Sequence, residues 1–378
     1  MQAEGRFGKR AGGLLQGDWR TPGSPSPATP AAKPAPVPST MGPAALHFGA
    51  RKASFMQEKR RAQQIVSLAK ERIGKAFEDL RFGRALNVDQ LWPLVTGINA
   101  SISRHPGALM GVTRLKDRHE YTYLHSVAVC GLMIGLARQM KLDPALHHEI
   151  GLAGLLHDIG KARVPTMLLD KPGPLTVEEE IIVREHARMG FETLMSGDDG
   201  LSTNERLSSI VLDACLHHHE RMDGSGYPDQ QRGNSISLFA RMAAICDTYD
   251  ATTSARVYKP AWSPAESLEY LANNPGQYDP EIVAPFSAMI GIFPVGSMVR
   301  LTSNRLAIVL EASEPDEMMP PVSPFYCIDS KQLLSLRRID STIDPIVGIE
   351  IPSRWNLPFF WQTRATILAH FDGSPPIE

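Results

Sequence analysis

Gly154-Leu-Leu-His157-Asp158-Ile-Gly-Lys161 is the stretch that decides how this chain is interpreted. Further along, the chain reads His217-His-His-Glu-Arg-Met-Asp-Gly-Ser-Gly-Tyr-Pro228. Both stretches place histidine, carboxylate or lysine in or beside apolar helical sequence, where such groups are costly unless a metal or an ion partner compensates them. We therefore expect helices built around a metal centre.

Composition limits what can surround such a centre. At 378 residues and 43% hydrophobic, the chain can bury one large core and a smaller second one. Its formal charge of -2 provides no global basic field, so binding to a nucleic acid polymer or an anionic membrane is not expected. The four cysteines form no Cys-x-x-Cys pair, and no apolar run of about 18 residues or signal-peptide core occurs. We expect a soluble, cytoplasmic protein.

Four regions follow from composition and periodicity. Residues 1–45 are rich in Gly, Pro, Ala and Ser and are expected to form a disordered tail, with Met41 as an alternative start. Residues 46–85 contain an expected linker helix, which we favour as leaning on the main domain over forming a homodimeric coiled coil. Residues 86–290 read as amphipathic helices and predict a mainly α bundle. Residues 291–378 carry β-branched clusters and predict a small β-rich extension.

Histidine and aspartate recur inside or at the ends of five of these expected helices, beside apolar residues. We expect their side chains to project inward. Imidazole and carboxylate together suit Fe, Mn, Zn or Ni, and the two oxygens of Asp158 can bridge two ions. One metal would be over-supplied, so we predict two ions held by His125, His157, Asp158, His186, His218, His219 and Asp247.

Two adjacent metals imply a particular chemistry. They can deprotonate a bridging water and stabilise both the attacking and the leaving oxygen of an in-line phosphoryl displacement. This predicts hydrolysis of a phosphoester. Lys161 follows Asp158 by one helical turn, so its ammonium can meet a non-bridging phosphate oxygen, the alternative being a solvated helix C-cap.

The order of these residues closely resembles the HD-GYP family, bacterial cyclic di-GMP phosphodiesterases within the HD superfamily. The resemblance covers about residues 86–300. It is carried by Leu156-His-Asp-Ile-Gly-Lys161, His218-His-Glu-Arg221, Asp223-Gly-Ser-Gly-Tyr-Pro228 and Asp247-Thr-Tyr-Asp-Ala251. The resemblance implies an HD-type helical bundle in second-messenger signalling. It also implies hydrolysis of cyclic di-GMP to pGpG, GMP or both by a hydroxide that bridges two ions, with iron or manganese expected.

The resemblance also assigns roles to residues. Metal ligation falls to the same seven side chains, with Asp158 bridging and Lys161 stabilising the developing charge. Substrate contacts fall to Lys161, Tyr227, Arg256 and Lys259. The Gly-Tyr-Pro segment should be a tight loop that exposes Tyr227, and in the family such loops also dock diguanylate cyclase partners.

Some residues near the motifs are not expected to bind metal. Members with a third metal carry a glutamate at the position of Tyr121, which favours two ions here, and Glu120 should face about 100 degrees away. His147, His148 and His217 are expected to be non-ligands. Asp250 follows Asp247 by one turn and could orient a ligand.

Two alternatives stay open. The same site could act on another cyclic dinucleotide or on a nucleoside phosphate. The chain could instead be a weakly active signalling module that binds partners through the Gly-Tyr-Pro loop. The complete ligand set argues against this second alternative, because a binding module has no need for seven buried polar ligands.

Overall fold

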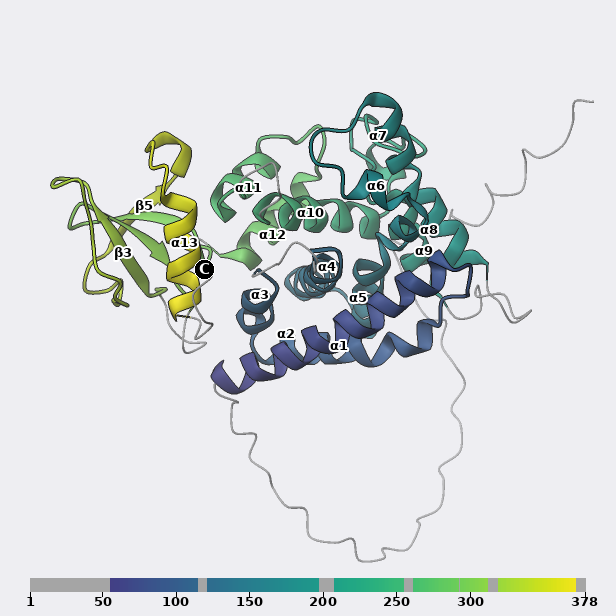
Figure 1. The fold of residues 1–378 in the computed structure, drawn as a ribbon, viewed down its shortest axis with the longest axis horizontal. Helices are drawn as coiled ribbons and strands as arrows, with labels where there is room; N and C mark the ends of the chain where they lie inside the picture. The colour runs from purple at the N-terminus through teal and green to yellow at the C-terminus, as the bar shows by residue number, and fades with distance from the viewer. Residues whose placement is uncertain are drawn as a thin grey trace, which may run out of the picture. The chain divides into compact units, whose positions relative to one another are not determined.

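The computed structural model describes most of the chain after the N-terminal region: residues 55–114, 121–196, 207–254, 261–291, 293–311 and 319–371. The expected tail, Glu120, Arg256 and Lys259 lie outside these residues. The described part contains a body of helices followed by an antiparallel sheet with one further helix (Figure 1). The expected mainly α fold with a small β-rich C-terminal region is confirmed.

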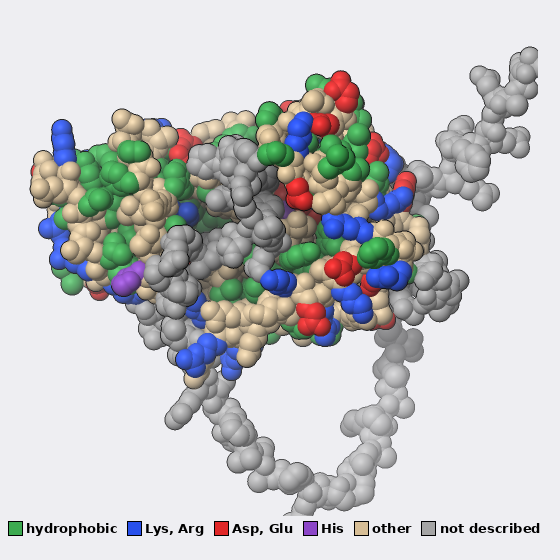
Figure 2. Space-filling view, in the orientation of Figure 1, with side chains coloured by type: hydrophobic (Ala, Val, Ile, Leu, Met, Phe, Trp, Pro, Cys, Tyr) green, Lys and Arg blue, Asp and Glu red, His purple; other side chains and the backbone are tan. Residues whose placement is uncertain are grey.

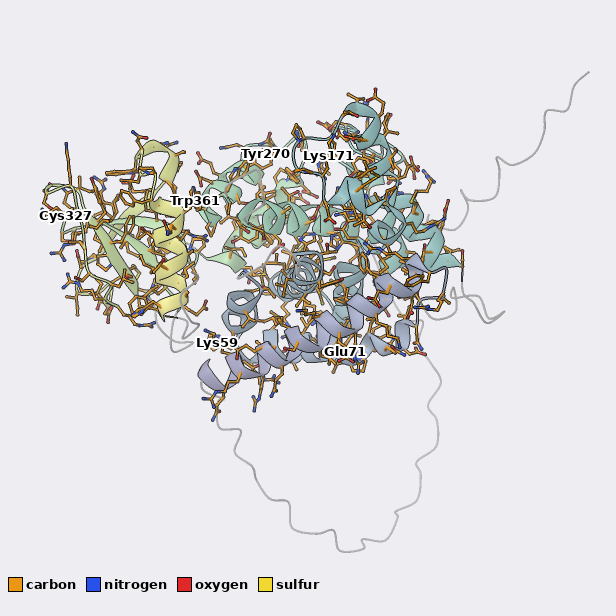
Figure 3. All side chains as sticks on the ribbon, viewed as in Figure 1. Lys59, Glu71, Lys171, Tyr270, Cys327 and Trp361 are labelled. Atoms are coloured by element: carbon orange, nitrogen blue, oxygen red, sulfur yellow. The ribbon has the colours of Figure 1, made fainter. Side chains whose placement is uncertain are left out.

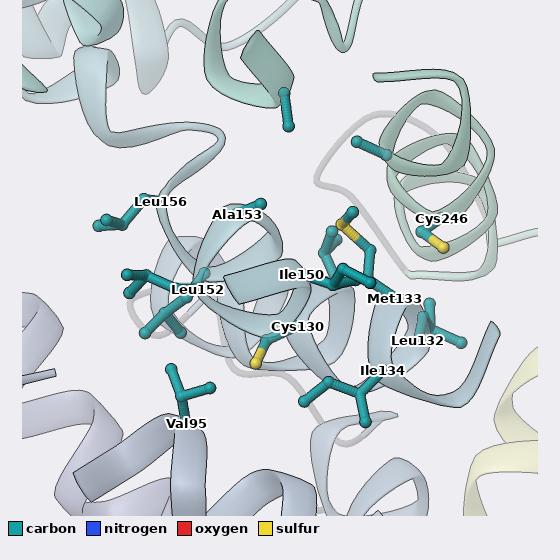
Figure 4. Close-up of a cluster of buried hydrophobic side chains, with 14 of the residues drawn as sticks. Val95, Cys130, Leu132, Met133, Ile134, Ile150, Leu152, Ala153, Leu156 and Cys246 are labelled. Carbon is teal, nitrogen blue, oxygen red and sulfur yellow. The ribbon is translucent and has the colours of Figure 1, made fainter. Parts of the chain in front are cut away.

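The helical body begins with five helices that share one core. They are α1 (Phe55–Arg81), α2 (Trp92–Arg104), α3 (Pro106–Arg114), α4 (Tyr121–Gln139) and α5 (His147–Leu156). Figure 4 shows part of the core, with Val95 of α2, Cys130 and Ile134 of α4, and Ile150 and Leu152 of α5. Helices that are apolar on all sides, as α4 and α5 are, belong in an interior.

Helix α1 is part of this body. Ala62, Ala69 and Ile73 are buried in the same core as α2 and α4. The fully buried carboxylate of Glu58 accepts two hydrogen bonds from Arg104 of α2, at 2.6 and 2.9 Å. A buried charge must be paired in this way, so the pair fixes α1 against α2.

Helices α4 and α5 approach each other closely enough to bring His125 near His157. A Cβ atom at Gly154 of α5 would lie only 2.9 Å from the Cα atom of Cys130 of α4. Only glycine allows this separation between the two backbones. The start of α4 therefore lies beside the end of α5, and the two histidines come from those ends.

The remaining helices complete the body: α6 (Thr166–Leu169), α7 (Val177–Arg184), α8 (His186–Met195), α9 (Ser209–His217), α10 (Leu238–Thr253), α11 (Pro264–Ala272) and α12 (Pro280–Ile290). Helix α7 starts at a capping box, in which Thr176 and Glu179 each bind the other's backbone N–H. Lys171, which is labelled in Figure 3, donates to the same glutamate at 2.5 Å.

The C-terminal region is a sheet of five antiparallel strands in the order β4-β3-β2-β1-β5. The strands are β1 (Met298–Leu301), β2 (Arg305–Val309), β3 (Val322–Cys327), β4 (Gln332–Leu333) and β5 (Ile346–Glu350). Met298 and Ile308 pack with Phe360 and Ile367 of α13 (Phe360–Phe371). The opposite face buries a second apolar cluster that includes Val299. Alternate residues of the strands therefore bury apolar side chains on both faces of the sheet.

Within the described ranges, every helix is too short or too polar to cross a membrane.

Candidate metal centre

The ends of helices supply most of the predicted ligands. His157 caps the C-terminus of α5, and Asp158 precedes the short 3-10 helix η3 (Ile159–Arg163). His186 is the first residue of α8, and His218 caps the C-terminus of α9. The other three side chains are those of His125 on α4, His219 after α9 and Asp247 on α10. The fold brings all seven side chains together.

Asp158 lies between two groups of side chains. The His186 group consists of Asp158, His186, His218 and His219, and the His125 group consists of His125, His157 and Asp158. In each group the potential ligand atoms lie within 4.8 Å of one another. Asp158 belongs to both groups.

The two oxygens of this carboxylate face different groups. Asp158 Oδ1 lies 3.2 Å from His186 Nε2 and 3.7 Å from His218 Nε2. Asp158 Oδ2 lies 3.5 Å from His125 Nε2 and 3.4 Å from His157 Nε2. This is the arrangement expected of a carboxylate that can bridge two cations.

Asp247 belongs beside the His125 group. Its Oδ1 lies 3.1 Å from His125 Nε2 and 3.9 Å from His157 Nε2. On the other side of Asp158, His186 Nε2 lies 3.4 Å from His218 Nε2 and 3.2 Å from His219 Nε2. Imidazole Nε2 atoms therefore cluster on each side of Asp158.

Hydrogen bonds at Nδ1 set the orientation of these imidazoles. His157 Nδ1 donates to the carbonyl of Gly154 at 2.8 Å, and His186 Nδ1 donates to that of Val183 at 2.7 Å. His218 Nδ1 lies 2.9 Å from the carbonyl of Cys215. Because a neutral imidazole carries one proton, these bonds leave Nε2 with a free lone pair that faces Asp158.

Two buried atoms at the centre need a partner that the surrounding protein does not supply. Among the described residues, His157 Nε2 and Asp158 Oδ1 are buried and make no hydrogen bond. Leaving such groups unsatisfied costs about 1–3 kcal/mol each. A cation in the His125 group would satisfy His157 Nε2, and a cation in the His186 group would satisfy Asp158 Oδ1, so these residues fit bound metal.

The protonation of His218, His219 and Asp158 also suits metal binding. Burial lowers the pKa of His218 to about 4 and holds the pKa of His219 well below its usual range. Burial alone would raise the pKa of Asp158, but the charge of Lys161 opposes it, and the pKa lies well below the usual range. Neutral imidazole and ionised carboxylate are the forms that bind a metal.

Asp250 provides the orienting contact for His125. Its Oδ2 accepts a hydrogen bond of 2.7 Å from His125 Nδ1, and both side chains are buried. Such carboxylate–histidine contacts fix the ring and raise its basicity as a ligand. The contact agrees with the orienting role that the sequence suggests for Asp250.

We expect Asp250→Asn to weaken metal binding by about 10- to 100-fold, because an amide oxygen holds the His125 ring less firmly. Titration of the metal-free protein with Mn²⁺ measures this affinity. Asp340→Asn, which alters an exposed aspartate, serves as the control. Unchanged Mn²⁺ affinity in the Asp250 variant would contradict the orienting role.

Lys161 and Tyr227 flank the centre. Lys161 Nζ lies 2.5 Å from Asp158 Oδ2 and is partly exposed. The ring of Tyr227 stacks on that of His219, with centroids 4.6 Å apart and planes 29° apart. Burial raises the pKa of Tyr227, so its hydroxyl stays protonated at neutral pH.

Glu220 holds the loop that carries Tyr227. Its buried carboxylate accepts hydrogen bonds from the backbone N–H groups of Asp229 at 2.7 Å and Gln231 at 3.1 Å. Sequence reasoning missed this role, although Glu220 lies inside the His218-His-Glu-Arg motif. The buried glutamate fixes the end of the loop, and thereby the position of Tyr227.

The histidines expected to be non-ligands lie outside both groups. His217 Nδ1 contacts Asp213 at 2.7 Å and its Nε2 contacts Asp229 at 3.0 Å, so both nitrogens are engaged away from the centre. His147 Nε2 lies 3.3 Å from the carbonyl of Leu142. Glu120, and the side chain of Tyr121, are outside the described part of the chain.

Comparison with known proteins gives matches over most of the chain. The HD domain family model matches residues 102–282. A cyclic di-GMP phosphodiesterase of Pseudomonas aeruginosa is 45% identical over 310 residues, which cover 81% of this chain and 73% of that protein. The cyclic di-GMP phosphodiesterase response regulator RpfG of Xanthomonas campestris is 37% identical over 205 residues, or 53% of this chain and 51% of RpfG.

A solved structure also aligns with the chain. It is Bd1817, an HD-GYP-type protein from Bdellovibrio bacteriovorus, with 18% identity and a TM-score of 0.49. The alignment covers 65% of this chain and 74% of that structure.

Proposed function

The chain belongs to the HD-GYP family of phosphodiesterases, and we propose that it hydrolyses cyclic di-GMP. The single observation that carries this proposal is Asp158, whose two oxygens face separate groups of imidazoles. The similarity to the P. aeruginosa cyclic di-GMP phosphodiesterase, over 81% of the chain, supports the choice of substrate.

In this proposal the centre holds two divalent ions, of iron or manganese. The His186 group would hold one ion, the His125 group with Asp247 would hold the other, and Asp158 would serve both. Bound there, the ions would supply a hydroxide nucleophile at neutral pH and neutralise the charge of the phosphodiester. Imidazole and carboxylate ligands accept several divalent ions, and iron and manganese are the ions that the family resemblance implies.

The chain's own residues would then position the substrate and stabilise charge. Lys161, now 2.5 Å from Asp158, can donate to a non-bridging phosphate oxygen as negative charge develops. Tyr227 would contact the substrate beside His219. Arg256 and Lys259 complete the proposed set of cations. Cleavage of one phosphodiester opens the ring to pGpG, and cleavage of the second releases GMP.

The test is anaerobic purification with quantitative metal analysis, followed by a chromatographic assay of cyclic di-GMP breakdown. We expect close to two ions per chain, and pGpG or GMP as the product. Cyclic GMP-AMP and simple nucleotides, tested in parallel, measure the preference for guanine. A metal-loaded protein that leaves cyclic di-GMP intact but cleaves another phosphoester would overturn the substrate assignment.

Two further roles belong to the same proposal. The Gly-Tyr-Pro loop, held by Glu220, could dock a diguanylate cyclase partner, and two copies of the chain could pair. Both roles fit a signalling enzyme of the cytoplasm. Co-purification with a diguanylate cyclase, and sedimentation of the isolated chain, test them separately.

A further inference from the structure

Arg184 is the last residue of α7 and lies next to the candidate metal centre. It was not among the site residues predicted from the sequence. It precedes His186 by two residues. Its guanidinium carbon lies 5.0 Å from the centroid of the Tyr227 ring. Tyr227 in turn stacks on His219. The guanidinium therefore contacts the same ring that stacks on a potential metal ligand.

The present partner of Arg184 is weakly held. Arg184 Nη2 donates to Glu180 Oε1 at 2.6 Å, and Nε donates to the same oxygen at 3.1 Å. Both side chains are about half exposed, at 48% and 51%. Exposed pairs one helical turn apart contribute little to stability. The guanidinium can therefore exchange this contact for a bound ligand at small cost.

The surface around α6 and α7 also leaves Arg184 accessible. Met167, Val177 and Ile181 are exposed there, and Figure 2 shows hydrophobic and charged side chains mingled over this part of the helical body. Figure 1 shows α7 at the edge of the body beside α6. A ligand that reaches the centre past Tyr227 would meet the guanidinium at this edge.

We propose that Arg184 binds a purine base of the substrate by stacking its guanidinium plane on that base. Arg184 contacts the Tyr227 ring, and that ring stacks on the ligand His219, so the guanidinium lies where it can meet the nucleoside of a ligand whose phosphate binds at the centre. Guanidinium planes and aromatic rings are the groups on which proteins stack unpaired bases. The proposal rests on the proposed function only for the identity of the natural nucleotide.

The test measures binding of GMP and ribose 5-phosphate to the Mn²⁺-loaded full chain by calorimetry. The two ligands share a phosphate and differ in the base. We expect wild type to bind GMP about tenfold more tightly, since stacking of one base is typically that strong. Arg184→Met and Arg184→Lys should both lose most of this preference, with unchanged ribose 5-phosphate affinity and metal content, because lysine keeps the charge but lacks the plane.

Arg163→Met is the matched control. Arg163 is equally exposed, at 47%, and pairs with Glu192 at 3.5 Å. It should keep the wild-type preference for GMP. Full GMP affinity in Arg184→Lys would overturn the stacking role in favour of a charge contact, and equal binding of both ligands by wild type would overturn a base site altogether. Failure of wild type to cleave cyclic di-GMP would instead count against the proposed function, whatever the GMP preference.

Discussion

Asp158→Ala should abolish turnover of cyclic di-GMP and bound metal together. Its two oxygens are the only carboxylate atoms, among the described residues, that both candidate groups share. Removing it leaves the His186 group with imidazoles alone and the His125 group with Asp247 as its remaining carboxylate, and it leaves Lys161 without its partner. Loss of an outer contact to a ligand costs about 10- to 100-fold, so loss of a shared ligand should exceed about a hundredfold.

Metal analysis and the chromatographic assay, made on the same preparation, measure both effects. Asp170→Ala provides a control, because Asp170 is an exposed aspartate at the end of α6. Circular dichroism establishes that the variant keeps its helices. Full turnover in the Asp158 variant would refute the bridging role, and metal retained without turnover would restrict that role to catalysis.

Gly160→Ala is expected to damage both stability and the centre. A Cβ atom at this position would lie 1.9 Å from the carbonyl oxygen of His186 and 2.4 Å from the backbone nitrogen of Gly190. Backbone atoms cannot rotate away, so η3 and α8 would have to separate. Overpacking of this kind costs about 1–3 kcal/mol, and we expect the upper end of that range. The separation also moves His186 away from Asp158, now 3.2 Å apart.

Denaturant unfolding measures the free-energy change, and a Mn²⁺ titration measures the loss of binding. Gly111→Ala is the matched control, because a Cβ atom there would meet nothing within 4 Å and the residue lies in helix α3. That change should leave stability unchanged or raise it slightly, since alanine favours helix more than glycine. A Gly160 variant with wild-type stability and affinity would show that η3 and α8 tolerate separation.

Much of the candidate site could be predicted because its residue types are rare in apolar helices. His125, His157 and Asp247 stand out from their neighbours by the cost of burying them. These side chains come together because, in a helical bundle, the inward-facing residues of neighbouring helices share one interior. Asp250 could also be predicted, because its spacing from Asp247 places both on one face of α10.

Other parts of the site depend on contacts that no spacing reveals. Glu220 acts through backbone N–H groups nine and eleven residues later, so its role appears only when the loop folds back. Arg184 looks like an ordinary exposed arginine of an amphipathic helix. It approaches Tyr227 across 43 positions of sequence because α7 packs beside that loop. The hydrogen bond from Arg104 of α2 to Glu58 of α1 likewise has no signal in the spacing.

The sequence by itself determined the helical character of the main body and the β-rich C-terminal region, and it supplied the candidates for metal ligation. Hydrophobic periodicity and the cost of burying polar groups depend on neighbouring residues in the sequence, so both can be recognised from a single sequence. Tertiary structure alone decided which oxygen of Asp158 faces which histidines, and that Asp247 lies with His125. Those assignments depend on how closely helices approach, as at Gly154 and Gly160, and ångström-scale packing is a property of the folded whole.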